Sequence, residues 1–143
     1  MKPRDDEGQV SVLIVGFVAV LVVLIGVVVD ASAAFLQRAG LNSLADSAAL
    51  AATDGVQGEA IYTHGLGQRG QIDPEAARNY AEVYLTESGA RQMYAGLTAV
   101  VSTNNNLVRV RLVAPLDLPL RVPGVGASAL ISAEAASVVV LTR

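Results

Sequence analysis

The first apolar pattern in the chain is an unbroken run of 20 residues, Val10–Val29, without a charged side chain. Charged residues stand at positions 4–7 before it, and Asp30 follows it. At about 1.5 Å per residue, a helix of this length covers about 30 Å, the thickness of the hydrocarbon core of a bilayer. The pattern predicts a transmembrane helix over residues 10–29, with residues 1–9 as a cytoplasmic tip.

Two other interpretations of this run remain open. A signal peptide would be cleaved near Ala31-Ser32-Ala33, where small residues stand as a signal peptidase requires, but its apolar core would be shorter, at about 7–15 residues. A buried helix of a soluble protein rarely stays apolar around its whole circumference. The length and uniformity of the run favour a permanent anchor.

The residues after the run keep a helical pattern and become rich in alanine. One apolar stripe recurs at helical spacing, and we expect it to contact another helix or a sheet: Ala34, Leu41, Ala45, Ala48 and Ala52. Gly40 inside the segment indicates a bend or a tight contact. Asp54-Gly55 supplies a stop signal, so a helical extension is predicted over residues 30–54.

Residues 55–72 contain five glycines and no sustained period, which predicts an irregular surface connection. Helix signals then agree at Asp73-Pro74-Glu75, because Asp73 can cap, proline suits the first helical position, and Glu75 meets the positive end of the helix dipole. Apolar residues follow at helical spacing until Gly89. The sequence predicts a second helix between these limits.

From Leu97 the period changes to two, which predicts two strands joined at Asn104-Asn105-Asn106, with Arg109 and Arg111 on the solvent face. Prolines make residues 116–122 at most an edge strand. A closing strand is expected within residues 129–141, centred near residues 137–141, with residues 133–136 as an alternative helical turn. The predicted fold class is α+β, with one helix and an antiparallel sheet in an extracytoplasmic domain at residues 55–143.

Composition narrows the choice of partners. Ten Lys plus Arg and 13 Asp plus Glu give a net charge of −3, with both signs mixed along the chain, so no surface for nucleic acid is visible. The chain has no cysteine, which excludes disulfides and thiol chemistry. Lys2 and Arg4 before the apolar run, against Arg38 shortly after it, favour a cytoplasmic N-terminus. Membrane lipid is therefore the first expected partner.

Candidate chemistry is sparse. His64 is the single histidine, and its glycine-rich surroundings favour a surface loop over a catalytic or metal role. Residues 65–70 match GxGxxG by letter, but no strand precedes them and no helix follows, so a phosphate site is not expected. Asp30 is either a polar stop at the membrane interface or a contact with a basic group on a neighbouring helix. We expect no catalytic residue, cofactor, metal or small-molecule substrate.

Several N-terminal features together resemble the TadE/TadG-like pilus assembly proteins of the tight-adherence (Flp) system. They are a charged tip with glycine at Glu7-Gly8-Gln9, an apolar helix, Val29-Asp30 at its outer end, and the Ala-rich helix Leu41–Ala51. The resemblance covers roughly the first 55 residues. It implies an inner-membrane protein whose N-terminal helix packs with those of other pilus assembly or pilin-like membrane proteins.

Pilin-like relatives are processed after a glycine that has a glutamate five residues beyond it, which makes Gly8 the matching position. Leu13 stands where that glutamate would be, so the resemblance favours a permanently anchored accessory protein over a major pilus subunit. The expected function is non-enzymatic, in assembly or anchoring of a Flp pilus. The alternative is a secreted or anchored extracytoplasmic binding domain unrelated to pili. The candidate helix–helix contact residues are Asp30, Ala34, Leu41, Ala45, Ala48 and Ala52.

Overall fold

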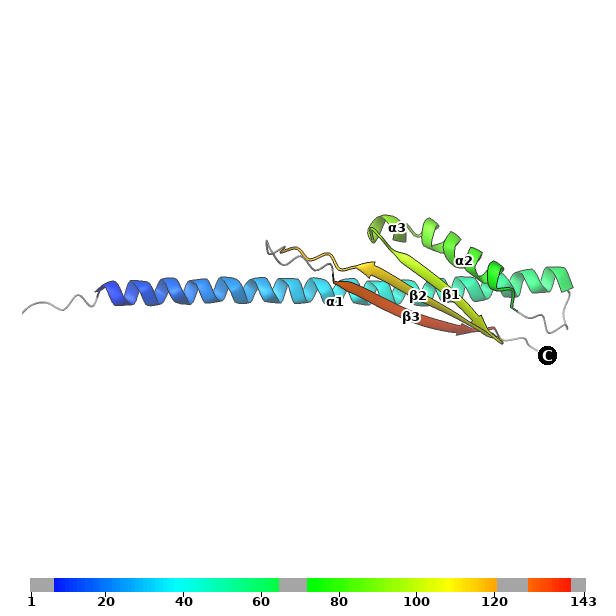
Figure 1. Cartoon of the computed structure of the whole chain (residues 1–143), viewed down its shortest axis with the longest axis horizontal. Coiled ribbons are helices and arrows are strands. Elements are labelled where there is room, and N and C mark those ends of the chain that lie inside the picture. The colour runs from blue at the N-terminus through cyan, green and yellow to red at the C-terminus, as the bar shows by residue number, and fades with distance from the viewer. Residues whose placement is uncertain (1–6, 65–71, 121–128, 140–143) are drawn as a thin grey trace, which may run out of the picture.

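The computed structural model describes residues 7–64, 72–120 and 129–139. Its elements are three helices followed by three strands: α1 (Glu7–His64), α2 (Pro74–Glu87), α3 (Ala90–Met93), β1 (Thr98–Asn104), β2 (Leu107–Pro115) and β3 (Leu130–Val138). Figure 1 shows all other elements gathered beside the C-terminal half of α1, while its N-terminal half projects as a bare rod. The molecule is therefore a long helix with a small α+β head, as the predicted fold class requires.

Helix α1 is a single element of 58 residues, about 87 Å long at 1.5 Å per residue. The predicted stop at Asp54-Gly55 is wrong, because the helix continues through Gly55 to His64. The expected irregular connection is therefore helical over residues 55–64, and His64 ends a helix rather than lying in a loop. The GxGxxG match at residues 65–70 lies outside the described residues.

Helix α2 begins where its signals predicted. The Asp73 carboxylate accepts a hydrogen bond from the Glu75 backbone N–H at 2.8 Å, which satisfies one of the free donors of the first turn. The chain leaves the helix through Gly89, which has a φ of +71° that suits glycine. The short helix α3, which the sequence did not predict, then follows.

The three strands form an antiparallel sheet in the order β1-β2-β3. Asn105 and Asn106 join β1 to β2, and Asn105 has the positive φ of +53° that asparagine tolerates, so the predicted hairpin is confirmed. Strand β3 begins at Leu130, and residues 133–136 lie within it rather than forming a helical turn. Residues 116–120 form no strand, although the Leu116 N–H donates to the Ala129 carbonyl at 2.7 Å.

The head has two layers, with α1 packed on β2 and β3 and α2 packed on α1 and β1. Alternate residues of β2 point into this interface, and Val108, Val110 and Leu112 are fully buried there. The opposite face of the sheet is exposed and carries Arg109 and Arg111, as predicted. A sheet with one apolar and one polar face follows from the period of two in the sequence.

Candidate functional site

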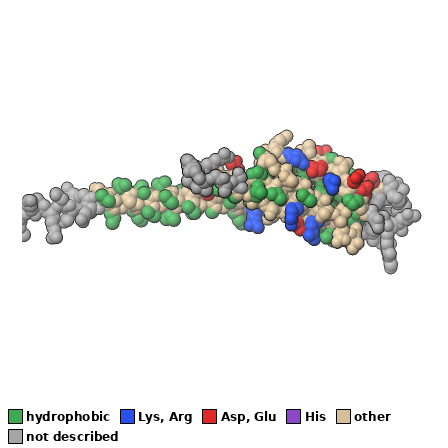
Figure 2. Space-filling model, in the orientation of Figure 1, with side chains coloured by type: hydrophobic (Ala, Val, Ile, Leu, Met, Phe, Trp, Pro, Cys, Tyr) green, Lys and Arg blue, Asp and Glu red, His purple; other side chains and the backbone are tan. Residues whose placement is uncertain are grey.

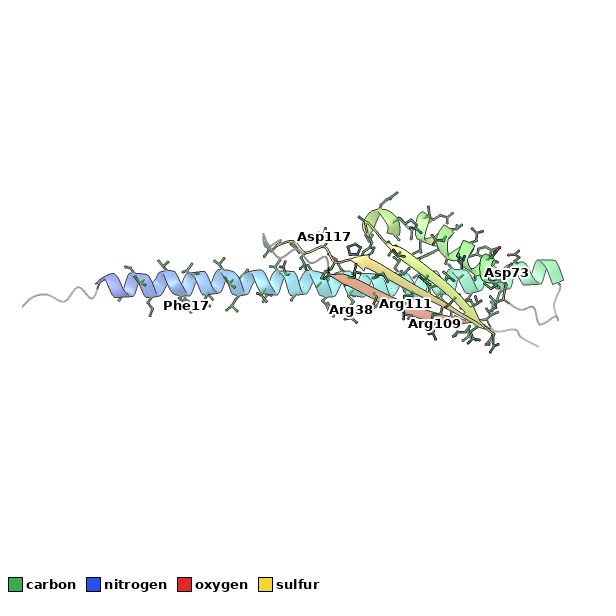
Figure 3. The ribbon with its side chains drawn as sticks, in the orientation of Figure 1. Phe17, Arg38, Asp73, Arg109, Arg111 and Asp117 are labelled. Carbon is green, nitrogen blue, oxygen red and sulfur yellow. The ribbon has the colours of Figure 1, made fainter. Side chains whose placement is uncertain are left out.

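The N-terminal part of α1 is an exposed apolar rod. It contains a window with a mean hydropathy of 3.4, of which none is buried, and it is the one helix in the described residues that is long and apolar enough to cross a membrane. Leu13 is 73% exposed and Phe17 is 62% exposed. Phe17 projects away from the rod in Figure 3, and hydrophobic side chains cover the visible face of the rod in Figure 2. Water is a poor solvent for such a surface, whereas lipid is a good one.

The predicted contact stripe continues on the same helix, within the head. Four of its members are completely buried inside this chain: Leu41, Ala45, Ala48 and Ala52. Small side chains let α2 and the sheet approach α1 closely, and Ala77, Ala81 and Leu85 of α2 belong to the same core. The stripe therefore holds the head on the helix. Of the six candidate residues, Asp30 and Ala34 remain partly exposed.

Between the rod and the head, the segment that follows β2 lies along α1. The Leu120 backbone N–H donates to Asp30 Oδ1 at 3.1 Å, and the Asp117 backbone N–H donates to Gln37 Oε1 at 3.1 Å. The Gln37 Nε2 group donates in return to the Asp117 carbonyl. The Gln37 side-chain amide thus forms hydrogen bonds with both the backbone N–H and the backbone carbonyl of Asp117, as the backbone of a neighbouring strand would. Asp117 lies directly above α1 in Figure 3.

The structural role of Gln37 was not predicted from the sequence. Its partner is 80 positions away, and no spacing pattern connects a helix residue with the backbone of an irregular segment. Gly40 was expected to mark a bend or a tight contact, and it marks a contact: a Cβ there would meet Tyr94 Oη at 2.6 Å. Tyr94 Oη in turn donates to the Gln37 carbonyl at 3.4 Å.

Two large apolar side chains are exposed just beyond the predicted span. Phe35 is 72% exposed and Leu36 is 67% exposed, and with Val28, Ala31 and Ser32 they line a shallow surface hollow on α1. This patch, residues 28–36 of α1, continues the exposed apolar surface of the rod toward the head.

The outer face of the sheet carries one charged cluster. Glu134 bonds Arg109 Nη1 at 3.1 Å and Arg111 Nη2 at 2.7 Å across the β2–β3 pair. The hydrogen bond from Arg111 and the charges of both arginines lower the pKa of Glu134 below its ordinary value. Arg38, Arg109 and Arg111 lie on the same side of the molecule in Figure 3. No group of three or more His, Cys, Asp or Glu that could hold a metal ion occurs in the described residues.

Comparison with known families adds to this geometry. Residues 8–58 match the family described as putative Flp pilus-assembly TadE/G-like. This N-terminal segment is therefore similar to that family. Searches of curated proteins and of solved structures gave no match. The TadE/G-like segment lies wholly within α1, so the family pattern describes the rod together with the surface on which the head packs.

The match begins at Gly8, the candidate processing position, which lies in the first turn of α1. Leu13 is exposed five residues further along the rod. The match supports a role in Flp pilus assembly, and the rod is consistent with a single-pass membrane anchor.

Proposed function

We propose that this protein is a single-pass membrane protein that acts in Flp pilus assembly as a non-enzymatic, pilin-like accessory component. The observation that carries the proposal is that the TadE/G-like segment lies within one helix, α1, whose two halves have different surroundings. Its first part is apolar and exposed, which suits lipid, and its second part contributes to the core of the head. The same segment thus anchors the protein and presents its folded domain.

The proposed orientation places the N-terminus in the cytoplasm and the head outside the inner membrane. Lys2 and Arg4 precede the span, whereas Arg38 is the single basic residue shortly after it. Basic residues in short flanking segments favour the cytoplasmic side. The head would then face the compartment in which pilus components assemble.

We place the contacts with other pilus assembly membrane proteins on the exposed patch at residues 28–36. The buried stripe from Leu41 to Ala52 is occupied by the head itself, so it offers a partner no surface. Phe35 and Leu36 are exposed, and Ala34, a candidate contact residue that keeps exposed surface, directly precedes them in the helix. A large apolar patch next to a membrane span suits a neighbouring transmembrane helix.

The proposal is tested by crosslinking in cells that make the pilus. A photoreactive benzoyl-phenylalanine replaces Phe35 in one variant and Leu50 in another; Leu50 is 56% exposed on the same helix, at the level of the head. We expect crosslinks from position 35 to pilins or to other membrane components of the pilus machinery, and far fewer from position 50. Deleting the gene should also abolish piliation, and expression of the wild-type chain should restore it. Normal piliation without this protein would contradict the proposal.

The mature N-terminus tests whether the anchor is permanent. Intact mass of the protein recovered from the membrane and from the soluble fractions distinguishes an unprocessed chain from one cleaved after Gly8 or after Ala33. The absence of glutamate at position 13 leads us to expect the unprocessed chain. A product beginning at Ala34 would show release of a secreted domain and would contradict the proposed anchor.

A further inference from the structure

The segment Leu116–Leu120 descends from the sheet along α1 toward the apolar rod (Figure 1). Two attachment points hold it, Gln37 to Asp117 and Asp30 to Leu120. Asp30 and Gln37 are seven residues apart on the helix, about 10.5 Å along its axis. Three residues of extended chain reach at most about 10–11 Å. The stretch from Asp117 to Leu120 therefore follows the helix toward its N-terminus and bends at residues 119–120.

Its last described residue reaches the level of the apolar run. A Cβ on Gly26 would lie 3.2 Å from Leu120 Cδ1, so the leucine side chain rests on the bare backbone of that glycine. Gly26 precedes Asp30 by four residues, which places it about 6 Å further along the axis and inside the predicted span. Gly16, the other glycine of the run, has no atom within 4 Å of the corresponding position.

Two backbone positions at the end of the descending segment need no hydrogen bond from water. Pro119 has no N–H group, and the N–H of Leu120 is satisfied by the Asp30 carboxylate. The same hydrogen bond serves Asp30, whose charge stands at the end of the apolar run. Leu120 keeps 48% of its surface exposed, directly beside a helix turn that we place in lipid.

We propose that Leu120 inserts into the leaflet on the side of the head, giving the head a second attachment to the bilayer beside α1. The occupant of the exposed surface of Leu120 is lipid acyl chain, because the side chain lies at the depth of Gly26. Two attachments fix the rotation and the height of the head, so the sheet presents a constant face to other components at the membrane. This inference rests on the proposed anchor in the preceding section.

The experiment uses the absence of cysteine in the full-length chain. Single cysteines replace Leu120, Leu50 or Phe17, each is spin-labelled, and the proteins are reconstituted in vesicles of phosphatidylethanolamine and phosphatidylglycerol. Collision of the label with oxygen, which concentrates in lipid, is compared with collision with a water-soluble nickel complex. Leu50 is the matched control, because it is a leucine with 56% exposure that lies 20 residues, or about 30 Å, beyond Asp30.

We expect the labels at positions 17 and 120 to favour oxygen and the label at position 50 to favour nickel, with at least a severalfold difference in the ratio. A label at position 120 that behaves like that at position 50, while position 17 reports lipid, would overturn the insertion and leave the anchor standing. A water-exposed label at position 17 would instead overturn the anchor itself.

A second measurement avoids the label. Lipids that carry a nitroxide on the acyl chain close to the headgroup should broaden the NMR methyl signals of native Leu120 and leave those of Leu50 sharp. The Leu120→Ile variant assigns the Leu120 signals. Equal, weak broadening of both leucines would overturn the insertion.

Discussion

The ring of Tyr80 on α2 lies directly against the backbone of Gly55 on α1. A Cβ at position 55 would be 2.3 Å from Cγ of that ring, closer than real atoms approach. The Tyr80 hydroxyl extends past this contact and donates to Glu59 Oε2 at 3.4 Å. Gly55 therefore makes room for the second helix rather than ending the first.

Replacing Gly55 with alanine should destabilise the head by about 1–3 kcal/mol, because the added methyl group forces the two helices apart. Gly58→Ala is the control: it lies one turn further along α1, and nothing stands within 4 Å of its added Cβ. That variant should be neutral or more stable by up to about 1 kcal/mol, through helix propensity. Urea unfolding followed by circular dichroism in detergent measures both. Equal effects of the two substitutions would contradict the assigned contact.

This contact also explains why the helix end predicted at Asp54-Gly55 is wrong. Glycine after Asp54 is a common helix stop, but it is equally a residue that lets another element approach, and the local sequence does not distinguish the two. The start of α2 and the hairpin at Asn105 were predicted correctly because their signals are local: a cap, a proline and a turn residue. Local signals carry information about the chain's own neighbours in sequence.

The apolar stripe on α1 was also visible in the sequence, but its partner was not. Helical spacing identified Leu41, Ala45 and Ala48 as a packing face, and the structure buries all three. The surfaces that cover them come from α2 and from the sheet, dozens of residues later. Periodicity predicts that a face is buried without specifying what buries it.

A charge on this face should unfold the head rather than detach a partner. Ala48→Glu places a carboxylate where the side chain is fully buried, and we expect a loss of about 4 kcal/mol or more. Leu50→Glu, two residues away on an exposed position, should change stability by no more than about 0.5 kcal/mol. Thermal unfolding, followed through the circular dichroism signal of the sheet, compares the stability of the two variants. A stable, folded Ala48→Glu head would show that the stripe faces outward.

The pairing of Gln37 with Asp117 predicts local protection from hydrogen exchange. Gln37→Leu removes both hydrogen bonds, and the loss of about 0.5–1.5 kcal/mol corresponds to exchange of the Asp117 amide about 2–12 times faster. Gln37→Glu keeps the acceptor for this amide, so its protection should fall less. Unchanged exchange in Gln37→Leu would show that the segment after β2 is held elsewhere.

Glu134 should titrate at a lower pH than an ordinary glutamate. Its hydrogen bond with Arg111 and the two arginine charges favour the carboxylate, so the pKa of Glu134 in the folded protein lies below that of the unfolded chain. The resulting stabilisation is complete above the ordinary carboxyl range of about 4–4.5 and is lost as the pH falls through the lower pKa of the folded state. Carboxyl carbon NMR measures this titration directly. Arg111→Gln should raise the pKa of Glu134, whereas Arg91→Gln, which removes the partner of Glu82, should not.

The central claim is that residues 10–29 cross a membrane and leave the head on its outer side. Val100→Cys provides a single thiol on the exposed face of the sheet, where the native side chain is 54% exposed. We predict that this full-length variant stays in the membrane fraction and reacts with a membrane-impermeant maleimide in intact spheroplasts. Labelling that requires lysis of the spheroplasts, or recovery of the full-length chain in the soluble fraction, would contradict the account.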